Sequence, residues 1–206
     1  MLLRGRKGKP LKHTDAEGMV YSDEGLIISF ERHPKISLFS FKGKKIKKLP
    51  LAKVLKNIKN YQKKNRALEA VVVHPDFGLL TAPEGALKKE DKNFHIIYGL
   101  KQRWTFKAQA KITAMELMEN KNILILERDF NYLSGHTILL SELNLSQCEN
   151  SVCLPRILAT LKSSKGWNLD NFEGLTHIKD NVYLMISDDN ASPFQKCLLT
   201  LFEVNR

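Results

Sequence analysis

One pattern recurs four times along this chain and restricts the folds that are open to it. Each copy opens on a Glu among small or apolar residues, continues into a polar turn, and ends in a short apolar run that closes on an acid. The copies cover residues 15–32, 67–85, 113–130 and 172–190. Apolar runs on both sides of a tight turn predict a β-hairpin. A further apolar run follows each hairpin, at residues 35–41, 94–100, 136–143 and 197–204.

Groups of three or four strands that return about every 50 residues are typical of β-propeller blades. The sequence therefore predicts an all-β chain with about four antiparallel blades in a single domain that spans residues 1–206. The predicted blades lie near residues 13–49, 67–108, 112–145 and 171–204.

Two segments depart from the strand pattern and predict short helices inserted between blades. In residues 50–65, the apolar side chains Leu51, Val54, Leu55, Ile58 and Tyr61 recur with helical spacing, opposite a row of lysines. Residues 154–164 give a weaker form of the same pattern. An amphipathic helix of this kind most often packs on its own domain.

Positive charge is concentrated in the first third of the chain. Residues 1–66 hold 18 Lys and Arg against 5 Asp and Glu, whereas the whole chain has a net charge of +11. This asymmetry fits either a solvated lysine-rich surface or an anion-binding face. The basic run 42–48 contains no aromatic residue on which bases could stack, so we expect no specific nucleic-acid binding.

The remaining composition leaves the cellular location unknown. The sequence contains no apolar run of about 20 residues that predicts a transmembrane segment, and no signal peptide at its start. Cys148 and Cys153 lie in one polar loop, and Cys197 lies apart from them. The loop pair would close a small disulfide in an oxidising compartment and stay as thiols in a reducing one, and we expect thiols for the chain as it stands.

Several short blocks resemble a known family. The blocks DAEGM, SFER, LEAV, APEG, ITAMEL, LERDF, NFEGL and ISDDN occur in this order. Together they resemble the signature blocks of the bacterial family called esterase-like activity of phytase, over residues 15–204. The resemblance implies a six-bladed propeller, hydrolysis of phosphate or carboxylic esters, and frequent export to the periplasm. Because family members carry further N-terminal blades, we expect a C-terminal fragment of a member, with missing blades or self-association.

The repeated acids are the candidate site residues. Opening acids at equivalent points of a propeller should share one rim of the channel mouth, where crowded carboxylates need a cation such as Ca²⁺ or Mg²⁺, or pairing with arginine. The candidate metal ligands are Glu17, Glu69, Glu116, Glu173, Asp188 and Asp189. The closing acids and the arginines beside them could supply a base and a phosphate clamp. The candidate catalytic residues are Glu31, Arg32, Glu127, Arg128 and Asp188.

These residues favour a hydrolase over two alternatives. The sequence has no GxSxG nucleophile elbow and no nucleotide-binding glycine loop. The leading interpretation is a phytase- or esterase-like propeller that acts on a small anionic or ester ligand. The alternatives are a non-catalytic propeller that binds a ligand or protein at its channel mouth, and an inactive gene fragment.

Overall fold

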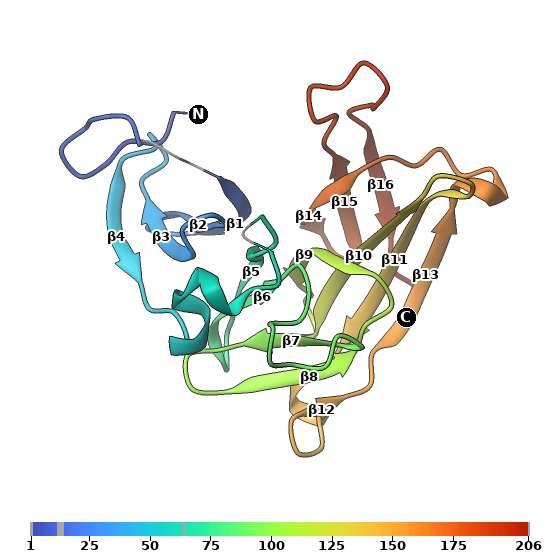
Figure 1. Cartoon of the computed structure of the whole chain (residues 1–206), viewed down its shortest axis with the longest axis horizontal. Helices are drawn as coiled ribbons and strands as arrows, with labels where there is room; N and C mark the ends of the chain where they lie inside the picture. The colour runs from blue at the N-terminus through green and yellow to red at the C-terminus, as the bar shows by residue number, and fades with distance from the viewer. Residues whose placement is uncertain (1, 12–14, 64, 206) are drawn as a thin grey trace. The chain divides into compact units, whose positions relative to one another are not determined.

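The computed structural model describes residues 2–11, 15–63 and 65–205 (Figure 1). Its regular elements are β-strands and a few short 3-10 helices, and the strands form four sheets. The predicted all-β class with antiparallel blades is confirmed. The chain divides into two compact units, Met1–Arg103 and Trp104–Arg206, which are described separately. Within the described part of the chain, no helix is long and apolar enough to cross a membrane.

The first sheet of unit one is a four-stranded antiparallel meander. Its strands are β1 (Ala16–Ser22), β2 (Gly25–Phe30), β3 (Lys35–Phe39) and β4 (Lys45–Leu49), in the order β1-β2-β3-β4. The turn between β1 and β2 needs the glycine at position 25, because its φ is +141° and an added Cβ would collide with the carbonyl of Phe39. Arg4 pairs with residues 43–45 at the edge of this sheet.

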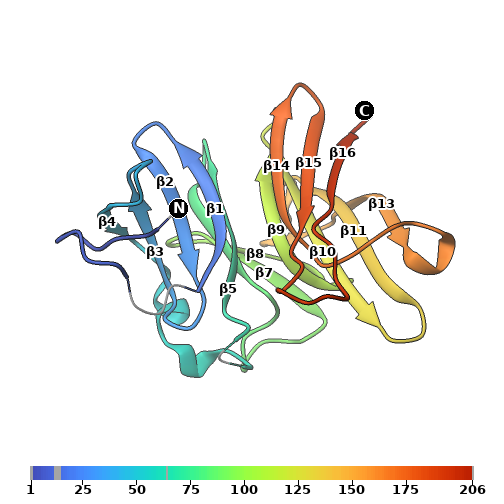
Figure 2. The same ribbon diagram turned by 90° about the horizontal axis from the view of Figure 1, so that it is seen from above.

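The second sheet starts with β5 (Leu68–His74), β6 (Gly78–Pro83) and β7 (Phe94–Tyr98). Within unit one, β5 packs beside β1, so the first strands of the two blades are neighbours (Figure 2). A buried cluster between the sheets includes Ile36, Leu38, Leu68, Val71 and Tyr98. This packing of first strands is the arrangement expected of successive blades.

The prediction of a regular helix in residues 50–65 is wrong, although most of its predicted apolar face is buried. The segment forms two 3-10 helices, η1 (Lys53–Lys56) and η2 (Ile58–Asn60). They are separated by Asn57, whose backbone is extended. The Asn60 side chain donates to the carbonyl of Val54 over 2.7 Å, and the Tyr61 hydroxyl donates to the carbonyl of Leu55 over 2.8 Å. Side chains thus take up carbonyls that a continuous α-helix would use.

Unit two opens with β8 (Arg103–Lys107), whose first residue still belongs to unit one. The third sheet lies in this unit and contains four strands in the order β13-β11-β10-β9. They are β9 (Lys111–Leu117), β10 (Ile123–Asn131), β11 (Gly135–Leu143) and β13 (Arg156–Lys162). Two 3-10 turns, η3 (Leu145–Gln147) and η4 (Ser163–Lys165), follow β11 and β13. The short strand β12 (Val152–Cys153) pairs in parallel with β8.

The prediction of a helix in residues 154–164 is also wrong, because this segment forms β13. It pairs antiparallel with β11 from Thr137↔Lys162 to Glu142↔Arg156, with one shift in register. Leu158, Ala159 and Leu161 are only half buried and pack against the core of the sheet. Pairing with the free edge of β11 therefore overrides the weak helical spacing of these apolar residues.

The fourth sheet has three strands, β14 (Phe172–Lys179), β15 (Val182–Ser187) and β16 (Leu199–Glu203). Within unit two, β14 packs beside β9, as β5 does beside β1 in unit one. Phe172, Met185 and Leu126 lie in the core between these sheets.

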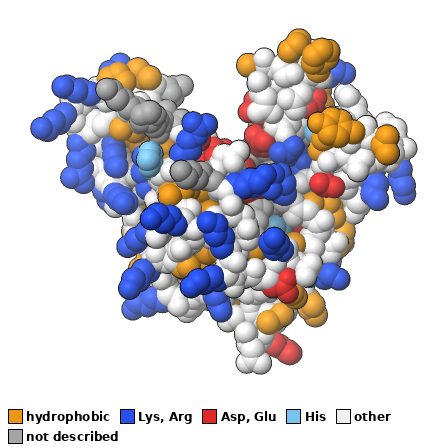
Figure 3. Space-filling view, in the orientation of Figure 1, with side chains coloured by type: hydrophobic (Ala, Val, Ile, Leu, Met, Phe, Trp, Pro, Cys, Tyr) orange, Lys and Arg blue, Asp and Glu red, His pale blue; other side chains and the backbone are white. Residues whose placement is uncertain are grey.

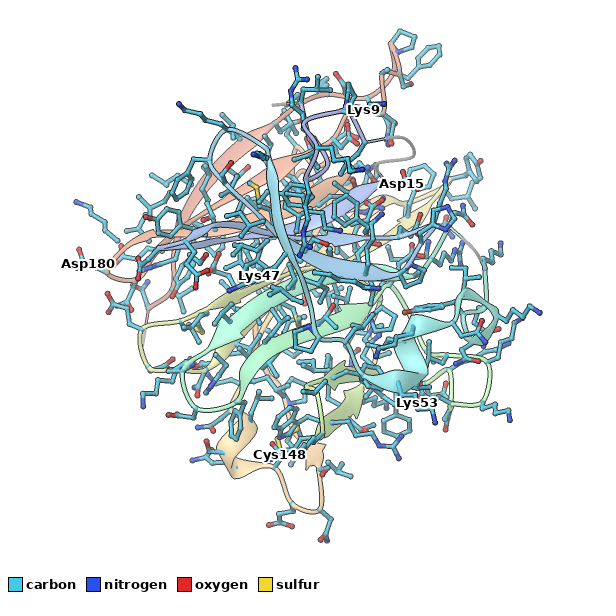
Figure 4. All side chains as sticks on the ribbon, turned by 90° about the vertical axis from the view of Figure 1, so that its left-hand side faces the viewer. Lys9, Asp15, Lys47, Lys53, Cys148 and Asp180 are labelled. Atoms are coloured by element: carbon cyan, nitrogen blue, oxygen red, sulfur yellow. A yellow bond between two sulfur atoms is a disulfide. The ribbon has the colours of Figure 1, made fainter. Side chains whose placement is uncertain are left out.

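The expectation that the loop cysteines stay as thiols is wrong. Cys148, labelled in Figure 4, forms a disulfide with Cys153 that closes the loop between β11 and β12. Cys197 is exposed and free. The two cysteines are five residues apart in the sequence. Their sulfurs meet because the loop between them turns back on itself, and Glu149 and Val152 exchange two backbone hydrogen bonds.

Candidate functional site

The pairing of strands shows which residues of the four repeats are equivalent. In each sheet the first strand carries a bulge near its start, opposite the second strand, and β14 has a further irregularity between His177 and Lys179. The bulges lie between Ala16 and Met19, Leu68 and Ala70, Ile112 and Ala114, and Phe172 and Gly174. A β-bulge turns one side chain out of the regular alternation, so these positions place a residue differently from the rest of the strand.

Three of the four opening acids occupy this bulge. Glu17, Glu69 and Glu173 lie in the bulges of β1, β5 and β14, and Thr113 takes the same position in β9. The expectation that all four opening acids lie at equivalent points is therefore wrong for Glu116, which is the sixth residue of β9. The third repeat aligns through ITAM with AEGM, LEAV and FEGL, and its acid lies three residues too late.

Glu116 has separate surroundings near the other end of β14. Its carboxylate accepts the backbone N–H of Leu117 over 3.0 Å and interacts with Thr176 and His177. Burial raises the pKa of Glu116, and these hydrogen bonds counteract the rise in part. Glu173 is the second residue of β14, whereas Thr176 and His177 lie further along it, so Glu116 and Glu173 do not form one cluster.

The closing acids share a backbone contact. In three blades, the backbone N–H of the closing acid donates to the carbonyl of the residue just before the first strand. These bonds are Glu31 to Asp15 over 3.0 Å, Glu84 to Ala67 over 3.1 Å and Asp188 to Asn171 over 3.0 Å. In the third sheet this position belongs to Arg128, and Glu127 lies one residue earlier. The buried Glu127 carboxylate instead accepts two backbone N–H groups of residues 109–110, each over 3.0 Å.

In unit one, the repeat brings three carboxylates together. Oxygens of Asp15, Glu17 and Glu31 lie within 4.8 Å of one another. Burial raises the pKa of Glu31, and the neighbouring charge of Asp15 adds to the rise, while a bond from the Ala67 N–H over 3.2 Å opposes it. Arg32 neutralises part of this charge, since its Nε lies 2.8 Å from Asp15. Oxygens grouped in this way could hold a hard cation or remain paired with arginine.

In unit two, a second polar group forms around Arg128. Its Nη2 lies 3.3 Å from Glu173, whose carboxylate also accepts the Asn171 amide over 2.7 Å. Nε2 of His136, on the neighbouring strand β11, lies 3.8 Å from the Asp170 carboxylate. These five side chains come from the closing position of the third repeat, the start of the fourth and the hairpin of β10 and β11.

Asp170 and His136 are largely buried and their surroundings fix their chemistry. The Asp170 carboxylate accepts the backbone N–H groups of Asn171 and Lys196, each over 2.8 Å, which sets its orientation. Burial lowers the pKa of His136, the charge of Arg128 lowers it further, and Asp170 opposes this shift. Within the residues described, Nδ1 of His136 and Nε of Arg128 are buried without a hydrogen-bond partner. A neutral imidazole and a fixed cation therefore both have unused polar atoms.

The remaining candidates have structural contacts. Asp188 and Asp189 accept backbone N–H groups two residues further on, over 3.0 and 2.9 Å, which is a turn-capping arrangement. The Ser187 hydroxyl is occupied by backbone bonds to Lys196 and Leu198.

Sequence reasoning missed His136, Asp170 and Asn171. Asn171 occupies the place of Asp15, immediately before the first strand of its blade, so a polar residue ahead of the opening Glu was a usable signal. His136 lies beside a hairpin turn where the sequence shows no motif, and only the pairing of β10 with β11 brings it near Arg128.

Comparison with protein families matches residues 1–191 to the phytase-like family, described as esterase-like activity of phytase. No curated protein matches the chain. Three solved structures resemble it at low identity. A protein of unknown function from Bacteroides caccae is 10% identical, with 95% of this chain and 80% of that chain covered and a TM-score of 0.44. The computationally designed protein Ika8 is 10% identical, with 96% and 50% covered and a TM-score of 0.38. The β-propeller domain of Cps50 (Swd1) from Myceliophteria thermophila is 13% identical, with 93% and 61% covered and a TM-score of 0.43.

Proposed function

Because the chain belongs to the phytase-like family described as esterase-like activity of phytase, we propose that it hydrolyses phosphate or carboxylic esters at the group around His136. The observation that supports this proposal is the buried His136–Asp170 pair beside Arg128. A histidine, an acid that orients it and a fixed cation are the parts that general-base hydrolysis requires.

The chemistry follows from the unused atoms. His136 is neutral near pH 7 and its buried Nδ1 has no hydrogen-bond partner, so a water molecule that enters beside it with the substrate would give its proton to Nδ1 while attacking the carbonyl carbon or the phosphorus. Asp170 stabilises the imidazolium that forms, as the acid does in a catalytic triad. The Arg128 Nε–H donates to the oxygen on which negative charge develops. The protonated His136 then returns the proton to the departing alkoxide, which balances the reaction.

Water is the nucleophile in this scheme. The nearby Ser187 hydroxyl donates to the Lys196 carbonyl over 2.6 Å and accepts the Leu198 N–H over 2.8 Å, so it is held in the backbone of the last blade. Arg128 would stabilise a phosphoryl oxygen or a tetrahedral carbon oxyanion equally well, so both ester classes are candidate substrates.

The test is turnover of p-nitrophenyl phosphate and p-nitrophenyl butyrate by the whole chain and two variants. We expect His136→Ala to lower kcat by about 100-fold or more, the range of general-base catalysis. The matched control is His177→Gln, which removes a half-buried histidine of the same unit whose ring nitrogen bonds the Asp180 carbonyl and whose ring packs on Tyr183, away from Asp170 and Arg128. Because burial holds the pKa of His136 below its ordinary value, kcat should reach its plateau at a correspondingly lower pH.

Two results would oppose the proposal. Turnover that survives His136→Ala unchanged would remove His136 from the reaction. Binding of either ester without turnover would favour the competing class, a non-catalytic propeller that recognises its ligand through the same polar group.

A further inference from the structure

A cleft in unit one is lined by positive side chains and by no acid. It has a volume of about 410 Å³ and lies where the turn between β2 and β3 meets the end of β4 and the η1 segment. Five of its lining side chains are basic, namely Arg32, His33, Lys35, Lys48 and Lys56. Lys and Arg side chains gather densely over this unit (Figure 3). The inference from this cleft does not depend on the proposed hydrolysis.

Strand pairing forces the lysines together. Lys35 begins β3, and Lys48 pairs opposite Ser37 near the end of β4, so both lie at the same end of the sheet. The register shift in β4 lies between Lys45 and Lys47. Burial lowers the pKa of Lys45, which is close enough to Lys48 for the charge of Lys48 to lower it further. The Lys35 ammonium also lies 4.7 Å from the centre of the Phe30 ring, which holds its stem against the core.

The positive charge of the cleft is poorly compensated. Lys47, which does not line it, pairs with Glu24 over 2.9 Å. Among the lining side chains, Arg32 has the carboxylate of Asp15 as its partner, and the described residues show no ion pair for Lys35, Lys48 or Lys56. Burial and then neighbouring lysines lower the pKa of Lys35 and of Lys45. Partial desolvation and mutual repulsion destabilise the charged form of these lysines. An anion bound between them would remove this destabilisation.

We propose that this cleft binds a small polyanion that carries two or more phosphate groups. A single phosphate would neutralise only part of a site with three unpaired lysines, whereas linked phosphates can contact Lys35, Lys48 and Lys56 together. The cleft has the size of sites that hold small molecules. It lacks the aromatic stacking platform that single-stranded nucleic acid uses, because Phe, Tyr and Trp are absent from its lining.

Calorimetric titration of inorganic tripolyphosphate, with orthophosphate as the comparison, tests the proposal on the whole chain. We expect tripolyphosphate to bind at least tenfold more tightly than orthophosphate and to raise the melting temperature, as any ligand of the folded state does. The double variant Lys35→Gln/Lys48→Gln should weaken binding at least tenfold. The matched control, Lys53→Gln/Lys59→Gln, removes the same net charge from exposed lysines outside the cleft and should change affinity by less than twofold. Figure 4 labels Lys53.

The outcomes separate a built site from general attraction. Equal weakening in both double variants would assign binding to net charge alone and overturn the proposal. So would tight binding of a 20-nucleotide single strand that tripolyphosphate fails to displace, because the surface would then serve nucleic acid. Melting curves of both variants without ligand identify any loss of fold, and the Lys35→Arg variant, which keeps the charge, should bind within about threefold of the unchanged chain.

Discussion

Replacing Gly18 with Ala tests how closely the first strands of neighbouring blades approach each other. A Cβ on Gly18 would lie 2.6 Å from the carbonyl oxygen of Glu69, 2.9 Å from Oγ of Ser29 and 3.0 Å from the amide nitrogen of Val71. Two of these three atoms belong to the backbone of β5, which cannot rotate away as a side-chain end can. The new methyl group must therefore push β1 and β5 apart.

The size of the effect follows from two opposing contributions. Overfilling a packed site costs about 1–3 kcal/mol. Replacing a glycine at an unstrained φ returns about 0.4–1 kcal/mol by reducing the entropy of the unfolded chain. We therefore expect the free energy of unfolding to fall by about 1–2 kcal/mol, which lowers the melting temperature by about 2–8 °C for a chain of this length.

Thermal and urea unfolding followed by circular dichroism measures this change. Gly85→Ala is the matched control, because no heavy atom lies within 4 Å of its added Cβ and its φ is not in the left-handed region. That variant should equal or slightly exceed the stability of the unchanged chain. If Gly18→Ala is as stable as Gly85→Ala, the close approach of β1 and β5 does not exist in solution.

Three further changes test individual contacts. Glu31→Gln should raise the free energy of unfolding at pH 7 by about 1 kcal/mol, because burial beside Asp15 raises the pKa of Glu31. The gain should vanish below pH 4.5, where the carboxyl group is protonated in both the folded and the unfolded chain. A gain that persists at that pH would contradict this reasoning. Although burial opposes it, hydrogen bonds hold the pKa of Glu142 low, so Glu142→Gln should cost about 1–3 kcal/mol at pH 7, and the difference from the unchanged chain should narrow as the pH falls below 4.5 in urea titrations. Reducing the Cys148–Cys153 disulfide should cost about 2 kcal/mol in the unfolding free energy, whereas a Cys148→Ser/Cys153→Ser variant should not respond to the reductant.

The sequence repeat predicted the hairpins well because strand alternation and turn residues are local signals. The sequence shows a small residue directly after the opening Glu, as in Gly18 and Gly174. The structure explains this choice, because a larger side chain at either position would collide with a neighbouring strand. The pattern of residues 154–164 does not distinguish a helix from a strand, because helical spacing and a half-buried edge strand place apolar residues similarly over so short a segment.

The candidate site was less predictable because it depends on pairing between distant segments. Aligning the third repeat on its acid placed Glu116 with Glu17, whereas the bulge in β9 places Thr113 there. His136 approaches Asp170 only through the strand order of unit two, which no local pattern encodes. The disulfide likewise depends on the redox conditions of the compartment as well as on spacing.

The backbone contact at the closing position lets each blade carry its own chemistry. Because the N–H of residue 31, 84 or 188 holds the blade together whatever side chain it bears, that side chain is free to vary. In the third repeat the equivalent position carries Arg128, whose guanidinium pairs with Glu173 at the start of the next blade. A repetitive scaffold thus acquires an asymmetric electrostatic centre through substitutions that leave its main-chain geometry untouched. The same positions are the natural places at which to graft new charge patterns onto this fold.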